Sequence, residues 1–62
     1  MKTYSVMCMG APDDFSSMCS VEVKALDVDG AKREAVKLMA RMGYPDATVL
    51  PDLPGMSAVL EL

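Results

Sequence analysis

Residues 21–35 read VEVKALDVDGAKREA and contain the change from strand to helix that decides the fold. Apolar and charged residues alternate at the start, which is the period-two pattern of a half-buried strand. Asp27 then stands where a helix N-cap is favoured. After it, apolar residues recur at spacings of three and four, the period of an amphipathic helix. The stretch therefore predicts a strand over residues 18–26 and a helix over residues 28–42.

The predicted helix has one apolar face, which we expect to pack on a sheet. Gly43 suits the left-handed residue that commonly follows a helix, and Pro45 cannot continue one. The members of the apolar stripe are Val28, Ala31, Ala35, Leu38, Met39 and Met42.

Further strands are predicted on both sides of this unit. Residues 2–9 alternate, and the loop GAPDDFSS at residues 10–17 joins them to the strand at 18–26 as a hairpin. After the helix, residues 47–50 and 57–62 are strand-like, and the turn residues of PDLPG separate them.

This order, ββαββ, predicts an α+β fold of two layers, with one helix on one face of a four-stranded, mainly antiparallel sheet. The rule for right-handed crossovers makes the third strand parallel to the second. The simplest arrangement has the strand order 2-1-3-4. A ββαβ fold, with residues 47–50 in a loop, is the alternative. A chain of 62 residues forms a single domain, 1–62.

Two cysteines fall on the same face of the predicted hairpin. If Val6 pairs with Val21, Cys8 lies opposite Cys19 and both face the helix, whereas a two-residue slip would separate them. Small buried thiols are the favoured interpretation, because reducing conditions in the cytoplasm keep cysteines free. A cross-strand disulfide and a Cu(I) site with Cys and Met ligands are the alternatives. We expect no metal and no cofactor.

The other face of the predicted sheet carries methionines and has no helix to cover it. Alternation places Met7, Met9 and Met18 there, together with Val49 and Val59. Flexible methionines on an open face suit a surface that adapts to a protein partner. Apolar residues scattered singly over a surface are the alternative. The three methionines are therefore candidate partner-binding residues.

The composition excludes several classes of function. Apolar residues make up 52% and charged residues 24%, which is a globular composition. The net charge of −3 argues against direct nucleic-acid binding, which needs a basic footprint. The chain has no histidine, no nucleophile–base pair and no glycine-rich phosphate loop, so we do not expect an enzyme. No apolar run reaches the roughly 18 residues of a membrane span, and no signal peptide is evident, so we expect a cytoplasmic protein.

Charge is unevenly distributed along the chain. The helix range 28–42 carries a net charge of +2, and the remaining residues carry −5. The predicted topology puts Asp13, Asp14 and Asp46 at one end, where the first hairpin turns and the helix finishes. Their carboxylates are a candidate contact for a basic surface of a partner protein. Ordinary solubilising charge in loops is the alternative.

Residues 21–35 read as a strand, an Asp cap and the start of an Ala-rich helix, with the KTYSV strand before them and short strands after them. In this order of elements the chain resembles small phage-encoded anti-CRISPR proteins of ββαββ architecture. Those proteins act on type I CRISPR surveillance complexes, so the resemblance implies an inhibitor of phage or mobile-element origin. The likeness is architectural and covers about residues 2–50. The member of that group with which we compare the chain is basic, whereas this chain is acidic. No functional residues are transferred from it.

These observations lead us to expect a small non-enzymatic binding protein that inhibits a host nucleic-acid-handling complex, with a type I CRISPR effector as the favoured target. It would act through its acidic surface, as a monomer or homodimer, without direct contact to nucleic acid or membrane. The alternative is a homodimeric antitoxin-like or regulatory module that pairs through Met7, Met9 and Met18.

Overall fold

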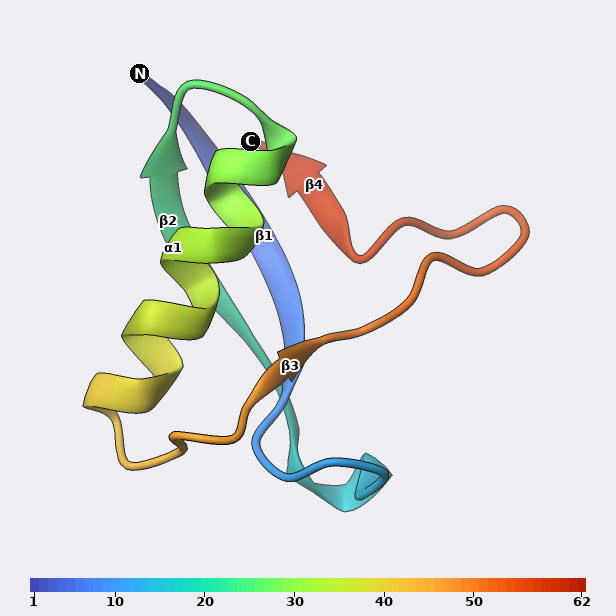
Figure 1. The fold of residues 1–62 in the computed structure, drawn as a ribbon. Coiled ribbons are helices and arrows are strands. Elements are labelled where there is room, and N and C mark those ends of the chain that lie inside the picture. Colours follow the sequence, from blue (N-terminus) through green and yellow to red (C-terminus); the bar gives the residue numbers. More distant parts are fainter.

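The structure is a computed structural model that describes all of residues 1–62. Its elements, in chain order, are β1 (Lys2–Met9), the short 3₁₀ helix η1 (Phe15–Ser17), β2 (Met18–Ala25), α1 (Val28–Arg41), β3 (Thr48–Val49) and β4 (Val59–Glu61). A single helix lies against one four-stranded sheet (Figure 1), so the predicted α+β class is confirmed.

β1 and β2 form the hairpin that the alternation predicts. They pair antiparallel with Val6 opposite Val21 and Cys8 opposite Cys19, which is the register expected from the sequence. The hairpin side chains that face α1 are buried except that of Cys19, which is partly exposed, and those of Val6 and Cys8 have no exposed surface. A one-residue slip would turn these apolar side chains to water, so burial of this face excludes such a slip.

The ends of α1 are formed by the expected residues. At the N-cap, the Asp27 carboxylate accepts a hydrogen bond of 2.7 Å from the Gly30 N–H. At the other end, Gly43 follows the C-cap residue Met42 and has a φ of 102°, the left-handed conformation that glycine adopts without steric cost.

Only the middle of the apolar stripe reaches the core. Ala31, Ala35 and Met39 have no exposed surface, and Leu38 packs against them while partly exposed. Val28 and Met42, which the spacing assigns to the same face, are 44% and 52% exposed. They are the first helical residue and the C-cap, where neighbouring elements cover a side chain less completely.

The strand order differs from the predicted 2-1-3-4. β1 is central and pairs with β2 on one side. On its other side, β3 pairs with the end of β1, and β4 pairs with its beginning, where Val59 lies opposite Val6. β3 and β4 therefore lie end to end along one edge of β1. The physical reason is length, because a two-residue β3 leaves most of the eight-residue β1 unpaired and β4 takes up those backbone groups.

This pairing also reverses the faces expected for the last two strands. Val49 is opposite Cys8 and Val59 is opposite Val6, so both valines lie on the helix side of the sheet. Leu60 lies on the open face and is 58% exposed. The prediction that the valines join the methionines is therefore wrong. Val59 changes face because β4 pairs with β1 rather than with β3, and Val49 lies on the helix side because the register of β3 sets it opposite Cys8.

The molecule is a two-layer slab with extents of 29 × 29 × 14 Å. α1 covers one face of the sheet, mainly over β1 and β2, and no helix or strand covers the other face (Figure 1). No helix in it has both the length and the apolar character needed to cross a membrane.

Candidate protein-binding surface

The topology predicts that Asp13, Asp14 and Asp46 share one end of the molecule, and we call residues 12–16 and 44–46 of the structure the acidic end. The hairpin loop and the end of α1 lie at the same end of the molecule (Figure 1). They are packed together, because a Cβ placed on Gly10 would lie 2.8 Å from Cδ1 of Tyr44. Asp13, Asp14 and Asp46 are all exposed there.

The three carboxylates of the acidic end have different roles in the fold. The Asp14 side chain caps η1 by accepting hydrogen bonds from the Ser16 N–H, at 3.1 Å, and from the Ser16 hydroxyl. Asp13 has a φ of 58°, a left-handed conformation that Asp tolerates better than most residues. Neither of the two ion pairs in the structure involves Asp13 or Asp46. Asp13 and Asp46 therefore present charges that a partner's cation could meet.

Two exposed aromatic rings accompany these charges. The chain has two tyrosines and one phenylalanine, of which Tyr4 is 2% exposed and lies in the core. Phe15 is 71% exposed and Tyr44 is 45% exposed, and both belong to the acidic end. Sequence reasoning missed them as site residues. Both rings lie in turn-rich segments outside the predicted strands and helix. That position could have been used to predict that they are exposed.

The methionines of the open face differ in exposure. Met18 is 41% exposed, Met7 is half-buried and Met9 is 8% exposed. Met9 and Met18 lie opposite each other at the end of the hairpin that leads into the acidic end. Met9 has little surface to offer a partner, so Met18 is the methionine of this set that a partner can reach most easily.

Met7 lies at the base of a projecting segment, residues 50–58, which we call the finger (Figure 1). The Leu50 N–H donates to the Met7 carbonyl at 3.0 Å, and the Met7 N–H donates to the Ala58 carbonyl at 2.8 Å. One residue of β1 therefore closes both ends of the finger. In effect the finger is an insertion within a single interrupted strand that runs along β1.

The turn of the finger is closed by hydrogen bonds within the segment. Leu53 and Met56 exchange backbone bonds of 3.0 and 2.9 Å, and Gly55 supplies the positive φ, 78°, of the turn between them. The Asp52 carboxylate accepts from the Ala58 N–H at 3.1 Å. Leu53 and Met56 are 58% and 66% exposed, so the finger presents apolar side chains to solvent.

The two cysteines are free, and they lie opposite each other on the helix side of the hairpin. Burial raises the pKa of the Cys8 thiol above its usual value of 9.0, and the neighbouring Cys19 raises it further. The Cys19 thiol donates to Sδ of Met39 at 3.5 Å. No group of three or more His, Cys, Asp or Glu side chains is placed to hold a metal ion. Cys8 is therefore a buried core thiol of low nucleophilicity.

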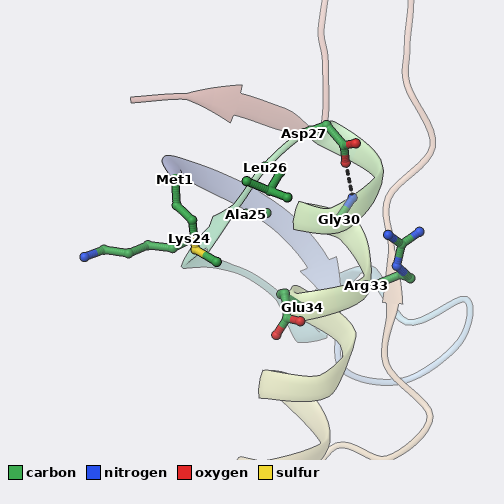
Figure 2. A pocket seen from close by; sticks show the side chains of 8 residues that line it. All are labelled: Met1, Lys24, Ala25, Leu26, Asp27, Gly30, Arg33 and Glu34. Atoms are coloured by element: carbon green, nitrogen blue, oxygen red, sulfur yellow. Dashed lines mark hydrogen bonds between the residues drawn. The ribbon is translucent and has the colours of Figure 1, made fainter.

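A pocket of about 230 Å³ lies beside the start of α1, and Figure 2 shows the side chains that line it. The N-terminus of a helix attracts anions, and Lys24 and Arg33 are both among the lining residues. The Asp27 carboxylate, however, already accepts from the Gly30 N–H at this point and would repel a second anion. The pocket therefore gives no support for phosphate binding.

The cations of α1 line an open groove on the other flank of the helix. Lys32, Arg33 and Lys37 surround a hollow of about 400 Å³ whose apolar members are Val36 and Val49. Basic and acidic surfaces are thus both present, and they belong to different parts of the molecule. Experiments on the acidic end need a control at this basic groove.

Comparison with known proteins identifies no relative of this chain. A scan of protein-family models finds no match to the chain, and searches of curated proteins and of solved structures find none either.

Proposed function

We propose that this chain is a small non-enzymatic binding protein that inhibits a nucleic-acid-handling complex of a host cell by occupying a protein surface of that complex. A type I CRISPR effector is the target that the ββαββ resemblance favours, and the host cytoplasm is the proposed place of action. The acidic end is the proposed contact.

The observation that carries this proposal is that exposed carboxylates without ion-pair partners and exposed aromatic rings occur in the two segments at one end of the molecule. Protein interfaces concentrate binding energy in aromatic anchors surrounded by a polar rim. Phe15, which is 71% exposed, can serve as such an anchor, with Asp13 and Asp46 in the rim. A protein surface that holds nucleic acid is basic, and an acidic ligand is complementary to it. For this reason we place the target among nucleic-acid-handling complexes.

The test measures binding of the purified chain to a panel of immobilised type I effector complexes, and the effect of the chain on their binding of target DNA. Asp13→Asn and Asp46→Asn each remove one charge, and Asn also tolerates the left-handed conformation of residue 13. Phe15→Ser removes the exposed ring. We expect each charge removal to weaken binding several-fold and Phe15→Ser to weaken it by about tenfold or more. Asp14 stays unchanged because it caps η1.

Two control variants change a charge elsewhere, Glu61→Gln by the same amount and sign and Lys32→Gln with the opposite sign. Glu61→Gln removes a carboxylate from β4, where it pairs with Lys2 at 3.6 Å, and Lys32→Gln removes a cation from the basic groove. Neither should change binding by more than about twofold, because exposed ion pairs and solvated charges contribute little. The proposal is overturned if no complex in the panel binds the chain. It is also overturned if Lys32→Gln weakens binding while the acidic-end variants bind as the parent does.

A further inference from the structure

β2 is a full-length edge strand whose outer backbone groups pair with no other strand. It spans eight residues and pairs with β1 alone. Natural sheets protect such an edge with proline, a bulge, a covering segment or a repelling charge, because it otherwise accepts another strand. β2 contains no proline, and its pairing with β1 runs without a bulge from one end to the other. Charge is the remaining protection, and Glu22 and Lys24 supply it.

The register shows which backbone groups of β2 face outward. On β1, the Met7 N–H donates toward the β4 side, to the Ala58 carbonyl at 2.8 Å. Backbone groups alternate sides along an antiparallel strand, so the even-numbered residues of β1 bond to β2. Their partners on β2 are Cys19, Val21, Val23 and Ala25. The N–H and C=O groups of Ser20, Glu22 and Lys24 therefore point to the open edge.

Glu22 and Lys24 disfavour pairing with strands that set a like charge opposite them. In a second copy of β2, however, the charges are complementary. Antiparallel pairing centred on Val23 places Glu22 of each copy opposite Lys24 of the other. These residues have outward backbone groups, so the facing residues exchange both backbone hydrogen bonds while their side chains form ion pairs. Pairing centred on Glu22 would instead set two carboxylates against each other, which is unfavourable.

The groove between β2 and α1 has the same complementarity. Its lining includes Glu34, Leu38 and Arg41 of the helix together with Val23 of the strand. A twofold axis through Val23 sets the two helices antiparallel on the same side of the joined sheet. The Glu34 end of one helix then faces the Arg41 end of the other, and the partly exposed Leu38 gains cover.

We propose that the chain forms a homodimer by antiparallel pairing of two β2 strands in the register centred on Val23. The inference goes beyond the proposed function, because it concerns self-association and uses none of the residues of the acidic end. Since the two copies run antiparallel, the dimer carries its acidic ends on opposite sides.

The test is sedimentation velocity of the purified chain from low to high micromolar concentration, with circular dichroism to confirm folding. We expect the parent to form a concentration-dependent dimer. Glu22→Lys and Lys24→Glu each set like charges opposite each other, and each should weaken the dimer on the order of tenfold. The double variant E22K/K24E restores opposite charges and should dimerise as the parent does.

Glu22→Pro tests the backbone pairing separately from charge. The Glu22 N–H points to the open edge, so a proline there removes no hydrogen bond to β1 and should leave a folded monomer. A parent that remains monomeric at high micromolar concentration overturns the proposal. So does an E22K/K24E variant that stays as weak as the single variants, or a folded Glu22→Pro variant that still dimerises. A dimer lost on Met18→Ser and insensitive to these changes would overturn it in favour of the methionine face.

Discussion

Replacing Met39 by alanine tests whether the core is built on α1 as the structure shows. Met39 is the largest side chain with no exposed surface, and its Sδ lies 3.5 Å from Sγ of Cys19. Truncating such a side chain loses transfer free energy and leaves a cavity, at a cost of about 2–5 kcal/mol. At roughly 0.05–0.15 kcal/mol per residue, a domain of this length is stable by about 3–9 kcal/mol. One substitution therefore removes a large part of the stability.

Met42→Ala is the matched control, since it makes the same chemical change in the same helical segment. Met42 belongs to the same predicted stripe but is 52% exposed at the C-cap. It has little burial to lose, so its free energy of unfolding should change by less than about 0.5 kcal/mol.

Urea and thermal unfolding followed by circular dichroism measure both variants. A loss of about 3 kcal/mol corresponds to a fall in Tm of roughly 12–24 °C for a domain of this size. Met39→Ala should show such a fall, while the midpoint of Met42→Ala should stay close to that of the parent. Equal losses in the two variants would refute the assignment of the buried helix face.

Three further perturbations test local features. Asp27→Ala removes the cap bond to Gly30 and should lower the free energy of unfolding, measured by urea titration, by about 1 kcal/mol. Asp27→Ser can still cap the helix, so its free energy of unfolding should fall by less. Gly10→Ala sets a Cβ 2.8 Å from the Tyr44 ring and should cost about 1–3 kcal/mol, and adding Tyr44→Ala should recover part of this loss if the clash is its cause. Burial raises the pKa of Cys8, so the unfolded state releases that proton first, and stability should be retained below the usual value of 9.0 and fall as the pH rises above it. Urea titrations across this range should show a shallower fall for Cys8→Ala than for the parent, and equal slopes would contradict the burial of the thiol.

Local periodicity is sufficient to predict the hairpin and the helix. In β1 and β2 the alternation is long, so a shift of one residue would expose every apolar side chain of the buried face. That constraint places Cys8 and Cys19 on the same face, and the structure then shows them directly opposite each other, in the register expected from pairing Val6 with Val21. The helix boundaries depend on short-range chemistry, namely the Asp27 cap and the conformation of Gly43, and these too can be recognised in the sequence.

The pairing of the last strands cannot be predicted in the same way. β4 has three residues, and apolar side chains occur at both parities between residues 57 and 62, so alternation does not select a face. The decisive interactions are backbone bonds at Met7, which receives both ends of the finger. Such bonds depend on which part of the β1 edge is free once β3 has ended. The pattern of apolar and polar side chains does not predict this.

The sequence predicts where the residues of the acidic end lie, but it does not predict their roles or their exposure. The topology alone brings Asp13, Asp14 and Asp46 to one end, because hairpin turns and helix ends are placed by element order. It does not distinguish the capping role of Asp14 from the free charges, and it does not show which aromatic rings the core leaves exposed. Exposure depends on how far each layer extends, which only the assembled slab determines.

The molecule is a slab 14 Å thick, and both proposed contact surfaces lie at an end or an edge of it. The open edge of β2 and the finger lie on opposite sides of β1, and the acidic end lies where the hairpin turns (Figure 1). Pairing through β2 therefore leaves both acidic ends and both fingers free. The two proposals do not compete for surface, and together they imply a dimer that can bind one partner at each acidic end. Loss of the dimer should then reduce avidity for a multivalent target without changing the affinity of a single acidic end.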